Sequence, residues 1–128
     1  MRAPRVRVFG PDPLVRNALS RLLHGDEPEL DADTAFDVGV WDLGLSPVEQ
    51  LDAPHKGPAI ALLPDARALP EVLAQGFSGA LLRTRDATEI SAAAFAVAAG
   101  MVVIDEAFIS ALGMREPRPR SSVELTAR

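Results

Sequence analysis

Short apolar runs alternate with amphipathic helical patterns along this chain, and the alternation restricts its fold class more than any other feature. Extended runs are expected at 5–9, 37–42, 59–63 and 80–82, with a further short extended piece at 101–104. Helices are expected at 13–24, 69–75, 87–99 and 105–112. This pattern predicts a parallel sheet with helices on both faces, a doubly wound α/β fold. Ligands of such sheets bind outside the carboxyl ends of the strands, so residues that end strands are the candidate functional residues.

The composition fits one domain of this class and excludes several kinds of site. The chain has 128 residues, of which 48% are hydrophobic and 24% charged, and it has no cysteine. Disulfides, zinc–thiolate sites and cysteine nucleophiles are therefore excluded. His24 and His55 form no ligand pattern, and no glycine-rich phosphate loop is present. We expect no metal, no cofactor and no enzymatic activity. With no long apolar run and no signal-peptide pattern, we expect a cytoplasmic protein without membrane contact.

Charge is distributed unevenly between the body of the chain and its tail. The first 114 residues hold nine Lys and Arg against 16 Asp and Glu, whereas residues 115–128 hold four Arg against two Glu. Binding to nucleic acid requires clustered cations that neutralise phosphates, so the acidic body is not expected to bind DNA itself. The stretch "REPRPRSS", residues 115–122, is rich in Pro and Arg and has no apolar period, as is typical of a linker.

The stretch "FDVGVWDLGL" places a carboxylate at the end of an apolar strand. It predicts that Asp42 lies at the carboxyl edge of the sheet. An Asp at this edge is either a reactive group or a structural carboxylate with a local partner. Asp12, before Pro13, has the pattern of a helix N-cap, since its carboxylate can accept the free amides of the first turn.

Five segments resemble, in order, parts of a known family. The family is the receiver domains of LuxR/NarL-type response regulators. Their first helix is similar to "PLVRNALSRLL" and their third strand to "FDVGVWDLGL". Their approach to the fifth strand is similar to "GFSGALLR", and their last helix with its extension to "AAAFAVAAGMVVIDEAF". "LTAR" resembles the start of the helix-turn-helix domain of these proteins. The resemblance implies a flavodoxin-like receiver domain with a five-stranded parallel sheet at 1–114, a linker at 115–122, and a truncated DNA-binding domain that starts at 123–128. DNA would be bound only through that last domain.

The resemblance also implies that Asp42 stands at the phosphoacceptor position and that the rest of the site has degenerated. Where the family has two acidic residues for Mg²⁺, a Thr or Ser, an aromatic residue and a Lys, this chain has Gly10 and Pro11, Leu63, Ala80 and Arg83. Phosphoryl transfer relies on the cation to neutralise developing charge, and Mg²⁺ requires oxygen ligands that Gly10 and Pro11 lack. The leading interpretation is therefore an atypical receiver that acts without phosphorylation. In this interpretation Asp42 is a structural carboxylate paired with Arg83, because the two residues would end neighbouring strands in the resembled fold.

Two other functions stay open. Asp42 could be a working phosphoacceptor, with a histidine kinase as partner and Asp12 as a substitute metal ligand. The emptied site around Gly10, Leu63 and Ala80 could instead bind a small-molecule effector.

Two structural expectations accompany these readings. The long helix at 87–99 is apolar nearly all round, which predicts a homodimer through Phe95, Ala92, Ala96 and Ala99. The final helix could instead fold back over that surface. The stretch between Gly25 and Asp37 is short, so we expect an edge strand at 29–35 and a second helix that is missing or reduced to a turn.

Overall fold

The chain forms a parallel sheet of five described strands, which confirms the predicted α/β class. The computed structural model describes residues 3–25, 35–51 and 57–113. The strands are β1 (Val6–Phe9), β2 (Val38–Asp42), β3 (Ala59–Leu63), β4 (Gly79–Leu82) and β5 (Val103–Ile104), and they lie side by side in that order. Every neighbouring pair is parallel.

The described sheet differs in one way from the expectation. The short extended piece expected at 101–104 is a strand of the sheet, β5, and it is the fifth strand among the described residues. The described strands follow chain order, so no reversal of strand order lies among them. The edge strand expected at 29–35 and the shortened second helix fall almost entirely outside the described residues.

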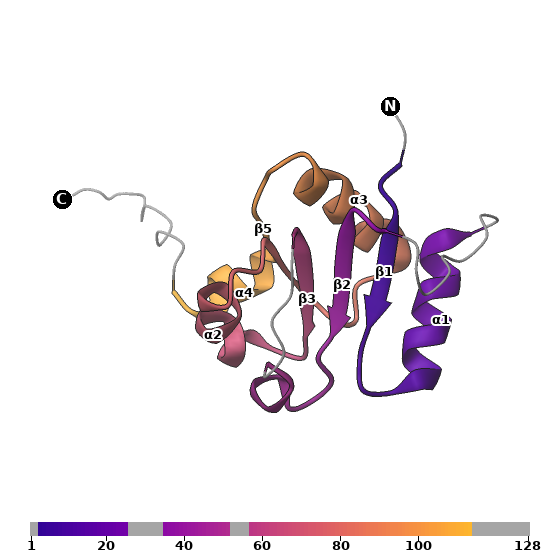
Figure 1. The fold of residues 1–128 in the computed structure, drawn as a ribbon. Helices are drawn as coiled ribbons and strands as arrows, with labels where there is room; N and C mark the ends of the chain where they lie inside the picture. The colour runs from indigo at the N-terminus through magenta and orange to yellow at the C-terminus, as the bar shows by residue number, and fades with distance from the viewer. Residues whose placement is uncertain (1–2, 26–34, 52–56, 114–128) are drawn as a thin grey trace.

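One face of the sheet is covered by α1 (Pro13–His24) and α3 (Ala87–Ala98) (Figure 1). The buried side chains on this face come from alternate strand positions and from the inner side of α3; they are Val6, Val38, Val40, Ile60, Leu62, Leu81, Ile90, Ala93, Ala94 and Val97. From α1, Leu19 and Leu23 pack against this cluster. Ile90, Ala94 and Val97 therefore form the predicted inward stripe of α3.

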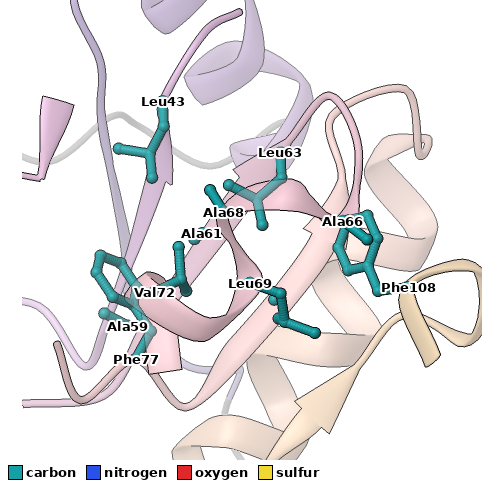
Figure 2. Close-up of a cluster of buried hydrophobic side chains, with 11 residues drawn as sticks. Leu43, Ala59, Ala61, Leu63, Ala66, Ala68, Leu69, Val72, Phe77 and Phe108 are labelled. Carbon is teal, nitrogen blue, oxygen red and sulfur yellow. The ribbon is translucent and has the colours of Figure 1, made fainter. Parts of the chain in front are cut away.

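The opposite face is covered by the short 3-10 helix η2 (Ala66–Ala68) and by α2 (Leu69–Ala74) and α4 (Glu106–Ala111). Figure 2 shows the second core on this side; its buried members are Leu43, Ala59, Ala61, Leu63, Ala66, Ala68, Leu69, Val72, Phe77, Ala80 and Phe108. Phe108 of α4 is 1% exposed, so α4 is part of the core and not a loose appendage.

Helix starts are set by aspartates, as the sequence predicts. Asp12 accepts the backbone amide of Leu14 at 2.9 Å, and Pro13 is the first residue of α1. Asp86 and Glu89 form a reciprocal capping box at the start of α3. Between β2 and β3, the described residues contain the 3-10 helix η1 (Pro47–Gln50).

No helix in the described ranges is long and apolar enough to cross a membrane. The linker expected at 115–122 and the start of a DNA-binding domain expected at 123–128 lie outside the described residues, so both stay predictions.

Candidate functional site

Asp42 ends β2 at the carboxyl edge of the sheet, where the sequence places it. Val38 and Val40 are buried in the core and fix the position of β2. Asp42 follows Val40 by two residues and is the last residue of the strand. Asp42 is only 3% exposed, and its Oδ1 accepts the backbone amide of Gly44 at 3.2 Å. A carboxylate this buried needs a charged partner as well as amides.

Arg83 is that partner, and the predicted contact is confirmed. Its Nε donates to Oδ1 of Asp42 at 3.0 Å and its Nη2 donates to Oδ2 at 3.1 Å, so the guanidinium grips both oxygens. Hydrogen bonding to Asp42 raises the pKa of Arg83, while burial opposes the rise; the nearby Asp12 also raises it. The site therefore holds a permanent cation of its own.

The reason for expecting this contact was wrong, however. The sequence interpretation placed Asp42 and Arg83 on neighbouring strands, but β3 lies between β2 and β4. Neighbouring strands are about 4.8 Å apart, so the pair spans about 10 Å across the end of β3. Arg83 can do this because its backbone amide is fixed on the carbonyl of Leu63 at 2.8 Å and its side chain is long.

Gly10 lies directly against Asp42, so a side chain at this position would be tightly packed. A Cβ atom added to Gly10 would be 3.0 Å from the backbone oxygen of Asp42 and 3.4 Å from its Cβ. The backbone oxygen of Gly10 accepts Nη1 of Arg16 at 2.8 Å, and Pro11 beside it is exposed. A second acidic ligand cannot be added here without moving the strand end, and Arg83 already holds both oxygens of Asp42. These residues do not fit a Mg²⁺ ion.

Leu63 and Ala80 lie in the core and not on an open site. Both are fully buried in the cluster under α2, where Figure 2 labels Leu63. They therefore do not line the emptied pocket that the sequence suggested with Gly10. The structure brings Gly10, Asp42 and Arg83 together and separates Leu63 and Ala80 from solvent.

Asp12 lies at the same edge of the sheet, but its carboxylate caps the N-terminus of α1. Its Oδ1 accepts Leu14 N, with a longer contact of 3.5 Å to Val15 N. In the described part of the chain, no three His, Cys, Asp or Glu side chains gather as metal ligands.

A second buried carboxylate, Asp105, was not singled out from the sequence. It follows β5, is 4% exposed, and is gripped by Arg85, with Nε at 2.8 Å from Oδ2 and Nη2 at 2.7 Å from Oδ1. The amides of Leu82 and Ala107 also donate to it, both at 3.0 Å. The Arg85 hydrogen bonds, helped by these amides and opposed by burial, lower the pKa of Asp105 to about 2. Arg85 has a raised pKa, chiefly from its hydrogen bonds to Asp105.

One signal in the sequence could have identified Asp105, although not its partner. Asp105 comes between an apolar extended piece and a helix, which is the position of a helix cap at a strand end. Arg83 and Arg85 lie in the turn that follows β4, so each can point to a different neighbour. Both carboxylates at this edge are thus held by arginines from one loop, residues 83–86.

The proposed interface residues of α3 lie mostly on its outer side. Phe95 is 42% exposed, Ala92 and Ala99 are exposed, and Ala96 is half-buried. The final helix, α4, packs on the opposite face of the sheet and so does not cover Phe95. On the neighbouring α1, Leu14 and Leu22 are exposed as well.

A cavity of about 310 Å³ lies beside the site, between the loops that follow β2 and β3. Its lining consists of Leu45, Ser46, Pro47, Glu49, Pro64, Asp65, Arg67 and Ala68. Asp65 and Arg67 in its wall are paired with each other, with Nη2 of Arg67 2.7 Å from Oδ2 of Asp65. None of the residues carried over from the family resemblance lines this cavity.

No family model matches the chain, and no curated protein matches it. Among solved structures, the chain is similar to a LuxR-family two-component response regulator from Aurantimonas sp. SI85-9A1. The two share 18% sequence identity with a TM-score of 0.62, over 88% of this chain and 97% of that one. At this identity the likeness shows a common fold: this chain has the flavodoxin-like architecture of that response regulator.

Proposed function

We propose that this chain is a receiver-like regulatory module of a transcription regulator and that it works without phosphorylation. The observation that carries the proposal is the two-pronged contact of Arg83 with Asp42. The fold shared with a response regulator supports the regulatory role. Output to DNA would belong to the helix-turn-helix domain that "LTAR" resembles, because the body of the chain is acidic.

Three features oppose phosphoryl transfer to Asp42. Both of its oxygens are hydrogen-bonded to a guanidinium, so neither is free to attack phosphorus. Gly10 and Pro11 supply no carboxylate for a cation, so the charge of a transferring phosphoryl group would not be neutralised. Leu63 is buried and has no hydroxyl with which to sense a phosphoryl group.

Trp41, next to Asp42 and stacked on Phe9 at a centroid distance of 4.3 Å, provides a built-in reporter for the test. Millimolar Mg²⁺, followed by beryllofluoride or acetyl phosphate, is expected to leave the fluorescence of Trp41 and the intact mass unchanged. Asp42→Asn is the control, because any change that persists in this variant does not come from the carboxylate. Saturable quenching by Mg²⁺, or an added phosphoryl mass on Asp42, would establish the alternative: a working phosphoacceptor served by a histidine kinase.

We further propose that the module forms a homodimer through the outer side of α3. Phe95 presents a large apolar ring there, with the small side chains of Ala92 and Ala99 beside it. Leu14 and Leu22 of the adjacent α1 are exposed apolar side chains as well. A two-fold arrangement would bury this surface against its own copy.

Light scattering over a range of concentrations tests the dimer. Phe95→Glu is expected to shift the wild-type dimer to monomer, because a charge would be buried at the interface. Leu112→Glu is a matched control, since Leu112 is equally exposed at 42% but lies beyond α4. A wild-type monomer at high concentration, or equal effects of the two substitutions, would contradict the proposal.

Effector binding is a second candidate, favoured by the cavity between the β2 and β3 loops. Its volume of about 310 Å³ lies at the lower end of the range for small-ligand pockets. It also lies at the carboxyl edge of the sheet, where ligands of α/β folds bind. A metabolite that raises the melting temperature of the wild type but not of Ala68→Phe, which fills the cavity, would support this function.

A further inference from the structure

We propose that the loop of residues 83–86 couples Asp42 to the docking of the C-terminal extension formed by β5 and α4. Arg83 holds Asp42 on one side of this loop, and Arg85 holds Asp105 on the other. The biological meaning of the coupling rests on the proposed regulatory role, but the coupling itself can be measured on the chain alone.

The extension is attached to the body at few points. β5 has two residues and pairs only with β4, through Gly79↔Val103 and Ala80↔Ile104. α4 has six residues and anchors one large side chain, Phe108, in the core. Such a short strand and helix have little stability of their own, so their docking depends on the remaining contacts.

Asp105 makes most of those remaining contacts. It stands at the junction of β5 and α4, accepts Leu82 N of β4 and Arg85 of the loop, and caps α4 through Ala107 N. Its own amide donates to the carbonyl of Ala80 at 2.8 Å. If Arg85 moves away, a buried carboxylate is left without its cation, so the position of Arg85 decides how firmly the extension is held.

The two arginines cannot move independently. Only Thr84 separates them, and the loop is fixed at both ends, by the Arg83 N to Leu63 O bond and by the capping box at Asp86. A ligand or modification that takes Arg83 from Asp42 must therefore turn the chain next to Arg85. The two buried carboxylates together hold one short loop in a single conformation, and this loop is a contiguous physical route between them.

Hydrogen exchange of the extension tests this coupling directly. In Asp42→Asn, which weakens the hold on Arg83, the backbone amides of residues 105–112 are expected to exchange several-fold faster than in the wild type. Those of residues 16–24 in α1, which packs on β1 and α3, are expected to change little. Arg83→Lys keeps the charge but loses the two-pronged contact, so it is expected to give the same pattern of exchange with a smaller increase. It replaces Asp42→Asn in the test if that variant fails to fold.

Coupling between two sites is reciprocal, which gives a second readout. Asp105→Asn is expected to alter the fluorescence of Trp41, beside Asp42, although Asp105 lies on the far side of the loop. Asp37→Asn is the control: it breaks another Asp–Arg pair, with Arg5 at the start of β1 and β2, and should leave the amides of residues 105–112 unchanged.

The coupling would be overturned by unchanged exchange at residues 105–112 in both variants, or by an equal rise throughout the chain. Neither result would affect the proposed phosphorylation-independent role, which the Mg²⁺ and acetyl phosphate experiment decides separately.

Discussion

Asp42 and Asp105 are two buried carboxylates at one edge of a sheet, and arginine is the residue suited to both. A guanidinium stays charged and offers paired donors that match the two oxygens of a carboxylate, whereas a lysine offers a single point charge. Asp42 receives one backbone amide, from Gly44, and Asp105 receives two, from Leu82 and Ala107. Asp105 is therefore the more completely satisfied of the pair.

Asp105 is expected to contribute stability that is lost in acid. Folding lowers its pKa from 3.8 to about 2, so its contribution is complete above about pH 4 and disappears as the pH falls through 2. A shift of this size corresponds to about 2 kcal/mol. Urea unfolding measures the free energy of unfolding of the wild type and of Asp105→Asn at pH 6 and at pH 2. The difference between the two proteins should be smaller at pH 2 than at pH 6 by about that amount. A difference that stays constant over this range would contradict the assignment.

Gly10→Asp, which restores the family's acidic residue, is expected to destabilise the chain without creating a Mg²⁺ site. The new Cβ would be 3.0 Å from the backbone oxygen of Asp42, so the strand end must shift. Overpacking of this kind costs about 1–3 kcal/mol. Chemical denaturation measures the loss, and Mg²⁺ titration followed through Trp41 measures binding. Gly57→Asp, where nothing lies within 4 Å of an added Cβ, controls for the added charge, although its positive φ adds some strain of its own. Saturable Mg²⁺ binding by Gly10→Asp would show that this one residue was the missing part of the site.

At the scale of single residues, the sequence predicts the place of a residue correctly where strand periodicity sets it. It does not do so where the place depends on tertiary packing. It located Asp42 at the sheet edge and named Arg83 as its partner. It treated Leu63 and Ala80 as site residues, although apolar side chains at a strand end are readily covered when a helix packs there, as α2 does. Asp105 was missed because its partner depends on β5 pairing with β4, which no local pattern indicates.

At the scale of the secondary-structure elements, Gly79 of β4 is the described glycine with the least space for an added side chain. An added Cβ there would lie 2.8 Å from Cγ1 of Ile60, its register partner on β3, which is fully buried. Gly79→Ala is therefore expected to cost about 1–3 kcal/mol of unfolding free energy, measured by urea titration. In an Ile60→Ala background the clashing atom is gone, so the same substitution should cost less than about 0.5 kcal/mol. Equal costs in both backgrounds would show that the glycine is needed for its backbone and not for the space.

The helices and strands with a strong period were predicted from the sequence, and the exceptions have physical reasons. Asp12 with Pro13 and Asp86 with Glu89 mark helix starts by local chemistry, so α1 and α3 begin where expected. The apolar stripe of α1 predicted a buried face, yet Leu14 and Leu22 are exposed and only its Leu19 and Leu23 reach the core. Periodicity identifies an apolar face, but it does not decide how much of that face the rest of the chain covers.

In the molecule as a whole, the sheet separates two cores that share no side chain. One lies under α1 and α3, and the other lies under η2, α2 and α4. Alternate residues of each central strand serve the two sides: Ala59, Ala61 and Leu63 point to one, and Ile60 and Leu62 point to the other. This two-sided burial explains why β3 reads in the sequence as a continuous apolar run. In the extension, Phe108 of α4 belongs to the core under η2, α2 and α4, whereas Val103 of β5 packs against the other core.

Substitutions in the two cores are therefore expected to act independently. Ile90→Val in α3 and Phe108→Leu in α4 lie on opposite faces of the sheet, with a full sheet layer between them, and each should cost about 1 kcal/mol of unfolding free energy. Their double variant should lose the sum to within about 0.5 kcal/mol, because sites this far apart share no packing partners. Phe108→Leu combined with Leu69→Ala, within the same core, should depart from additivity by more than that, because the two side chains pack in one cluster. Urea unfolding of the six proteins, wild type included, measures both cycles. If the pair on opposite faces coupled as strongly as the pair within one core, the sheet would be transmitting packing changes between its faces, and the two cores could not be treated as separate units.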